Sequence, residues 1–470
     1  METEKKLAQY VSDSTYSDLP GEPVDLIKKV ILAVMGTTIA GATAEGCDAL
    51  LAQVREWAGK KEATILVHGG KAPACNAVLI NSFMARALDF CDAMSPGIHI
   101  GSSAVPVALA SAELAGGCSG EDFLTALVLG TEVAARINSV SDYDGFDPTG
   151  VCTIFAATAV AGKILRLNSR QMLNALGLAF NRAGGSFQSN IDGTLAVRAI
   201  QGFASQGGIV CAQLAGKGIT GPENFLEGIY GYLHLYGKDK HKPQTVTAEL
   251  GQRFEAKKTV FKKYPSCACT LASTDAILDL VKEKDLTPDN VENVEIRVSP
   301  YIYRIAGHQF ILGDNPKVNA QFSIQFCVAN GLLRRGSKLP HFDEARVMDD
   351  KVLELVSKVH VLDDPGLGNP TAQGEHFSTE LSVRMKVVTR EGNTYYKDLD
   401  ILRGTPMNPL DDEEHMERFY DCLDYADKKL QKPNIDKILS TITRLEKVKD
   451  VRSLIPLLTP SKSAKSVGRK

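Results

Sequence analysis

The feature of this 470-residue sequence that most constrains its fold is a change of hydrophobic period near residue 265. Before that point the chain is rich in Ala and Gly, and segments such as 26–40 and 48–58 repeat apolar residues at helical spacing. Ser119 is a predicted helix N-cap, and either Asn168 or Ser169 is another. We therefore expect a large helical domain with several central, nearly all-apolar helices.

After residue 265 the pattern alternates with a period of two at 294–298 and 381–388, which predicts half-buried strands. The second strand continues through a turn at Gly392-Asn393 into 394–396, which indicates a β-hairpin. Two helices are expected between the strands, at 320–333 and 349–359.

Beyond the strands the sequence becomes helical again, with charged amphipathic segments at 411–428 and 432–446. This return suggests that the C-terminal helices pack on the first domain. We therefore predict a mainly α protein with an α+β lid. The helical domain comprises residues 1–265 together with 405–470, and the lid comprises 266–404.

Composition limits the possible functions. A hydrophobic content of 44% with 23% charged residues is typical of a soluble globular protein. The net charge of −3 argues against nucleic-acid binding. No stretch approaches the roughly 18 uninterrupted apolar residues of a membrane span, and the first residues lack a hydrophobic signal core. We therefore expect a cytoplasmic protein that binds neither nucleic acid nor membrane.

The cysteines and motifs give no support to a cofactor. Ten cysteines are spread along the chain, mostly within apolar runs, as expected of reduced thiols. The close pair Cys267 and Cys269 has a one-residue gap, not the two-residue gap of common zinc and redox motifs. HExxH, Walker and GxGxxG motifs are all missing, so we predict no metal and no cofactor.

The densest chemical signal is the segment 89–99. It holds Asp89, Asp92 and His99 on a loop broken by Pro and Gly that opens onto a helix. Such a loop could form an acid–base site, or it could be a polar connector with a surface histidine. Asp89 follows a helical run at 81–88, where a carboxylate opposes the helix dipole, which hints at function.

Two further candidates have equally plausible structural roles. Asp147 lies in the turn-forming segment 143–150, where it either starts a helix or contributes to a site. Arg198 lies in an apolar setting and needs an anion, which could be a protein carboxylate or a substrate.

The predicted domain junction supplies the remaining candidates. Lys262 and Lys263 could be solvated linker lysines or substrate ligands. Tyr301 and Tyr303 follow a predicted strand, so one could reach a cleft while the other packs. Carboxylates, an imidazole, phenols and cations together suit proton removal beside a carboxylate, with the cations holding an acidic substrate.

Four motifs carry a resemblance over most of the chain. They are Leu88-Asp89-Phe90-Cys91-Asp92 through His99 to Val105-Pro106, Arg198 to Gly202-Phe203-Ala204, Phe261-Lys262-Lys263-Tyr264-Pro265, and Asn319-Ala320-Gln321-Phe322-Ser323. With them the chain resembles the MmgE/PrpD family of 2-methylcitrate dehydratases, cis-aconitate decarboxylases and iminodisuccinate epimerases. The resemblance implies a helical domain built from both chain ends, an α+β lid, a homodimer and a metal-free site at the domain junction.

Residue by residue, the resemblance implies that Asp89 and His99 are the family's loop acid and histidine. Lys262 matches its junction lysine, and Tyr303 or Tyr301 matches its lid tyrosine. Four positions depart from the decarboxylases, in which a threonine, a histidine, a lysine and a second histidine stand at Ala93, Asp147, Val197 and Cys267. These departures argue against cis-aconitate as the substrate.

We therefore expect a cofactor-free lyase, a dehydratase acting on a small di- or tricarboxylate such as 2-methylcitrate. The alternatives are an epimerase of an iminodisuccinate-like amino dicarboxylate, a cis-aconitate-type decarboxylase and a non-catalytic carboxylate-binding protein. The expected catalytic residues are Asp89, His99, Asp147, Lys262 and Tyr303, and the expected substrate-binding residues are Arg198, Lys263, Tyr301 and Cys267.

Overall fold

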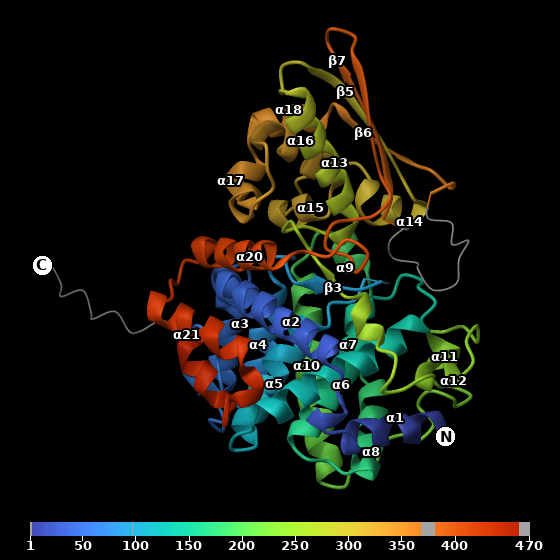
Figure 1. Ribbon diagram of the computed structural model, residues 1–470, viewed down its shortest axis with the longest axis vertical. Coiled ribbons are helices and arrows are strands. Elements are labelled where there is room, and N and C mark those ends of the chain that lie inside the picture. The colour runs from blue at the N-terminus through green and yellow to red at the C-terminus, as the bar shows by residue number, and fades with distance from the viewer. Residues whose placement is uncertain (1, 96, 368–380, 460–470) are drawn as a thin grey trace, which may run out of the picture.

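The computed structural model describes residues 2–95, 97–367 and 381–459 (Figure 1). It confirms the mainly α class with a smaller α+β part. The helices of the first half are α1 (Glu2–Asp13), α2 (Gly21–Ala40), α3 (Cys47–Trp57), α4 (Ala74–Arg86), α5 (Gly101–Leu114), α6 (Gly120–Ser139), α7 (Pro148–Ile164), α8 (Ser169–Phe180), α9 (Gln188–Ile191), α10 (Ala196–Gly216), α11 (Tyr232–Leu235) and α12 (Gln244–Thr247).

Helix α7 lies at the centre of this half and is buried along nearly its whole length, with α5, α6 and α10 against it. Small residues bring α10 close to α7. A Cβ added at Gly208 of α10 would lie 2.4 Å from the Cβ of Ala157 in α7, so only glycine fits there. The predicted caps are also present, since the side chain of Ser119 accepts from Asp122 N and that of Asn168 accepts from Gln171 N.

Helix α2, with the short turn that follows it, is the one helix within the described ranges that is long and apolar enough to cross a membrane. Of its apolar window, 72% is buried inside the protein. Such burial is that of a core helix, and α2 contacts α4, α5, α6 and α20.

The lid lies above the helical half in Figure 1 and is built on a four-stranded sheet of order β6-β5-β7-β8. Strand β5 pairs antiparallel with β7 and parallel with β6, and β7 and β8 form the predicted hairpin. The strands are β5 (Val291–Val298), β6 (Val359–Asp363), β7 (Val383–Thr389) and β8 (Thr394–Leu399). The lid helices are α13 (Ala268–Lys284), α14 (Pro300–Ile302), α15 (Pro316–Gln321), α16 (Ile324–Arg334), α17 (Glu344–Val347) and α18 (Asp350–Val356).

The structure corrects two expected lid helices. The helix predicted at 349–359 ends at Val356, and β6 then begins at Val359, because Val359 and Val361 turn the same face to the lid core. The helix predicted at 320–333 is split between α15 and α16. The side chain of Ser323 caps the second of these by accepting a hydrogen bond from Phe326 N.

The C-terminal segment returns to the helical half. Helices α20 (Asp412–Tyr425) and α21 (Lys432–Thr443) both contact α2, and Figure 1 shows them beside the N-terminal helices. Asp411 and Glu414 form a capping box that starts α20. The division at 1–265, 266–404 and 405–470 stays a prediction, and residues 460–470 lie outside the described part of the chain.

Two short ribbons complete the fold. Strands β1 (Ala63–Thr64) and β2 (Lys71–Ala72) form one of them. In the other, β3 (Asp92–Ala93) pairs antiparallel with β4 (Val260–Phe261), so that Asp92 lies opposite Phe261. This second ribbon holds the segment after α4 against the junction that leads into the lid.

Candidate active site

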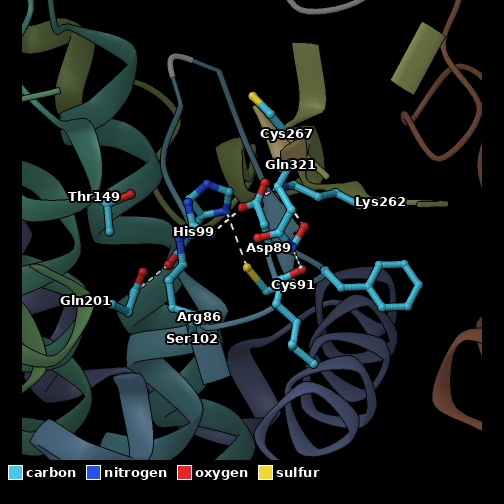
Figure 2. A network of polar contacts seen from close by, with 12 residues as sticks. Arg86, Asp89, Cys91, His99, Ser102, Thr149, Gln201, Lys262, Cys267 and Gln321 are labelled. Atoms are coloured by element: carbon cyan, nitrogen blue, oxygen red, sulfur yellow. Dashed lines mark hydrogen bonds and ion pairs between the residues drawn. The ribbon is translucent and has the colours of Figure 1, made fainter. Parts of the chain in front are cut away.

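The ribbon β3–β4 brings together two parts of the sequence that are far apart. Because Lys262 directly follows β4, its side chain reaches back to Asp89, just before β3. Lys262 Nζ lies 2.8 Å from Asp89 Oδ1 and donates a second hydrogen bond, of 3.1 Å, to the Asp89 backbone oxygen. Figure 2 shows both side chains meeting beside His99.

A second cation binds the same carboxylate. Arg86, the last residue of α4, donates from Nη1 to Asp89 Oδ1, and all three side chains are buried. Burial alone would raise the pKa of Asp89, but the charges of Arg86 and Lys262 outweigh it and lower this pKa to about 2. The carboxylate is therefore ionised at neutral pH, and the cluster of two cations and one anion carries a net positive charge.

The backbone of Asp89 has φ 49°, in the left-handed region that residues other than glycine rarely adopt. Such conformations persist where the surroundings fix them, and they are common at functional sites. Here the two cations on the side chain and Lys262 on the backbone oxygen supply that constraint.

His99 is held in one orientation. Its Nδ1 lies 2.7 Å from the backbone oxygen of Asp92 and donates to it, which leaves the lone pair on Nε2. Gln201 donates to the His99 backbone oxygen at 2.9 Å, and the carboxylate of Asp92 accepts from Gly101 N at the start of α5. Within the described ranges no hydrogen-bond partner occupies Nε2.

The surroundings keep the His99 imidazole neutral. Burial and then the nearby charges of Arg86 and Lys262 lower the pKa of His99 well below its usual 6.5. A neutral imidazole with a free Nε2 is equipped to accept a proton.

Asp147 behaves in the opposite way to Asp89. It is the N-cap of α7, and its Oδ1 accepts a 2.8 Å hydrogen bond from Thr149 N. Burial raises its pKa, so this carboxyl group holds its proton to a higher pH than an exposed aspartate. Neighbouring carboxyl groups with pKa values shifted in opposite directions are suited to separate acid and base roles.

These groups line one pocket with about 510 Å³ of empty space, part of it open to solvent. Thr149 faces the group from the α7 side in Figure 2, and Cys267 lies above Asp89 and Gln321. Six of the residues predicted from the sequence line this pocket: Asp89, His99, Asp147, Lys262, Cys267 and Tyr301.

The other three predicted residues, Lys263, Arg198 and Tyr303, do not line this pocket. Lys263 pairs with Asp275 at 2.9 Å, because successive side chains on an extended segment point in opposite directions. Arg198 is buried on α10, and its Nη1 binds Glu45 through the backbone oxygen at 2.7 Å and Oε2 at 3.0 Å. Of the two anions that the sequence allowed for Arg198, the structure supplies the protein carboxylate.

The lid contributes Tyr301 to the pocket in place of Tyr303. Tyr301 lies in α14, with its ring 5.9 Å from that of Tyr143 in the helical half. Tyr303 begins a π-helical turn, Tyr303–Gly307, and its ring packs against Gly307 and the lid core. π-helical turns often mark functional sites, and Ile305 of this turn reaches the pocket wall.

Sequence reasoning missed three polar residues of the pocket wall, which are Arg86, Thr149 and Asn190. A signal for Arg86 was present, because an arginine three residues before Asp89 on a helix is placed to pair with it. Thr149 and Asn190 carry no such local signal. Within the described residues, no three His, Cys, Asp or Glu side chains gather as metal ligands would.

Comparison with known proteins agrees with this architecture. Residues 5–245 match the MmgE/PrpD N-terminal domain, and residues 264–444 match the MmgE/PrpD C-terminal domain. The chain is 22% identical to the cis-aconitate decarboxylase-like protein oryM of Aspergillus oryzae and 22% identical to the cis-aconitate decarboxylase of Aspergillus terreus. Each alignment covers 97% of this chain and 96% of the relative. Since the two domain matches span most of its length, the chain belongs to the MmgE/PrpD family.

Proposed function

We propose that this protein is a lyase that removes the proton α to a carboxylate of a small di- or tricarboxylic acid and expels a β-hydroxyl group. A substrate of the 2-methylcitrate type fits this chemistry. The observation that carries the proposal is the neutral His99 imidazole, which opens onto the same pocket as the net positive cluster of Arg86, Asp89 and Lys262. Relatives named as decarboxylases also support a lyase.

In the proposed reaction, His99 Nε2 accepts the α-proton. The positive charge of Arg86 and Lys262 holds the substrate carboxylate and stabilises the enolate-like charge that develops on it. Asp147, whose pKa burial raises, donates a proton to the departing hydroxyl group, and Tyr301 donates a hydrogen bond to the same oxygen or to the oxyanion. These steps use side chains of this chain alone.

The choice of dehydration over decarboxylation of cis-aconitate draws support from the pocket wall. Ala93, Asp147 and Cys267, three of the four positions that differ from the resembled decarboxylases, line the pocket, and Val197 does not. The pocket therefore presents different groups to the substrate. Decarboxylation remains the second candidate because of the names of the relatives, and epimerisation needs the same proton abstraction.

We also propose that the protein is a cytoplasmic homodimer. One side of α10 supports the proposal of a dimer, since its side chains Phe203 and Leu214 are 58% and 41% exposed. Large apolar side chains gathered on one surface often mark a protein interface.

The test is incubation with a panel of hydroxy- and amino-dicarboxylates and tricarboxylates in D₂O. Deuterium at a carbon α to a carboxylate reports proton abstraction. Alkene formation then identifies dehydration, inversion identifies epimerisation, and released CO₂ identifies decarboxylation. Binding with neither exchange nor product formation across the whole panel would favour a non-catalytic carboxylate-binding protein and would refute the proposal.

A further inference from the structure

Cys267 and Cys269 lie together on the wall of the pocket, and the proposed proton transfers use neither thiol. Cys267 is the N-cap of α13, and Cys269 lies in the first turn of the same helix. Both side chains are buried except where they face the pocket. Small solutes that enter the pocket therefore meet two neighbouring thiols.

The surroundings favour the thiolate of Cys267. A hydrogen bond from the side chain of Cys269 lowers the pKa of Cys267, burial and the charge of Asp89 oppose this, and the charge of Lys262 lowers the pKa in turn, so that it lies below its usual value. The N-terminus of α13 adds the positive end of a helix dipole. By contrast, burial raises the pKa of Cys118 to about 12, although Cys118 borders another pocket.

We propose that Cys267 is a peroxide-reactive cysteine and that Cys269 resolves its oxidised form, so that the two form a disulfide on the pocket wall. Redox-sensing cysteines combine access from solvent with a neighbouring resolving thiol, and this pair has both. The one-residue spacing differs from the C-x-x-C motif of exchange catalysts. We therefore assign the pair a modification of this protein and no exchange activity on others.

The chemistry balances with hydrogen peroxide as the oxidant. The Cys267 thiolate attacks one peroxide oxygen, an S–O bond forms, the O–O bond breaks, and the leaving hydroxide takes a proton to become water. The Cys269 thiolate then attacks the Cys267 sulfur, the S–S bond forms and the S–O bond breaks. The departing hydroxide takes the proton that Cys269 released and leaves as a second water. Two thiols lose two electrons, and the peroxide gains them.

The two cysteines lie in one tryptic peptide, 264–282, which contains no other cysteine. After low peroxide, mass spectrometry of the whole protein digested without reductant should show this peptide lighter by about 2 Da, and dithiothreitol should restore its mass. In Cys269→Ser, dimedone should trap a sulfenic acid at Cys267. In Cys267→Ser, the peptide should stay unmodified. Cys118→Ser is the matched control and should form the disulfide as the wild type does.

Relative rates provide a second criterion. Because the pKa of Cys267 is lowered and that of Cys118 is raised, Cys267 has more thiolate at neutral pH, and peptide 264–282 should be oxidised faster than Cys118 at the same peroxide concentration. Equal oxidation of Cys118, a peptide 264–282 that gains oxygen without losing hydrogen, or unchanged oxidation in Cys267→Ser would each overturn the proposal. The readout is a mass and needs no substrate, so it is independent of the D₂O experiment.

Discussion

At the scale of single residues, the site depends on how the Arg86–Asp89–Lys262 cluster changes the pKa of the nearby His99. Burial and the same two cations that keep Asp89 ionised together keep His99 neutral. A single cluster thus provides both the charge that would hold an acidic substrate and a base ready to accept its proton.

Replacing His99 with Gln should lower kcat by about 10²- to 10⁴-fold, the usual contribution of a positioned general base. The measurement is turnover of the substrate identified in the D₂O panel. His360→Gln, on the exposed side of β6, is the matched control and should keep wild-type turnover. A His99→Gln enzyme with normal kcat would remove the imidazole from the mechanism.

His99 should also make stability depend on pH. Its pKa is well below 6.5 in the folded protein and returns to about 6.5 on unfolding, so below pH 6.5 the unfolded chain binds the extra proton. The stabilising contribution is therefore complete above pH 6.5 and is lost as the pH falls. From pH 7.5 to 5.5 the wild type should lose roughly 1 kcal/mol more free energy of unfolding than His99→Gln.

Urea unfolding of both proteins at the two pH values measures this difference. Three other histidines also have lowered pKa values: His68, His341 and His415. They contribute to the change of unfolding free energy with pH in both proteins, so only the difference between the wild type and His99→Gln reports His99. Identical slopes would mean that His99 is protonated as easily in the folded protein as in the unfolded chain.

At the scale of elements, local signals in the sequence were sufficient to predict caps and turns. Ser119 and Asn168 cap their helices as expected, and Gly392-Asn393 joins β7 to β8. Strand β6 could not be predicted in this way, because its parallel partner β5 lies more than 60 residues earlier and the intervening sequence has helical spacing. Hydrophobic period alone cannot identify such a partner.

The candidate site shows the same limit. The sequence placed Asp89, His99 and Lys262 in one site by resemblance, and the structure brings them into one pocket. The sequence could not predict that Arg198 would pair with Glu45, since that contact spans 153 positions of sequence. The direction of a side chain such as Tyr303 depends likewise on tertiary contacts.

The close approach of α10 and α7 gives a prediction at this scale. Gly208→Ala should destabilise the protein by about 1–3 kcal/mol, because the new methyl group would lie 2.4 Å from the Cβ of Ala157. Gly216→Ala on the same helix meets only the flexible end of Leu167, at 3.3 Å, and is the matched control. Urea unfolding measures the free energy of unfolding of both variants. Equal values would show that α10 and α7 can move apart without loss of stability.

At the scale of the whole molecule, the pocket is assembled from both halves of the chain. Arg86, Asp89 and His99 come from the helical half, Lys262 from the junction and Tyr301 from the lid. The short ribbon β3–β4 fixes the first group relative to Lys262. The geometry of the pocket therefore depends on this long-range strand pairing as much as on any single helix.

The proposed homodimer is tested at the same scale. Phe203→Glu should convert the dimer to a monomer, because a carboxylate on the exposed side of α10 would be buried without a partner. Size-exclusion chromatography with light scattering measures the mass. Trp57→Glu, on another exposed surface at the end of α3, should leave the dimer intact. A Phe203→Glu protein that remains dimeric would place the interface elsewhere.

The two-strand ribbon has one practical consequence. A chain cut between α12 and β4 would carry His99 on one fragment and Lys262 on the other, so neither fragment alone would hold a complete site. Turnover would return only when the fragments joined along the ribbon. The fold could thus be engineered into a split reporter whose signal is the chemistry itself.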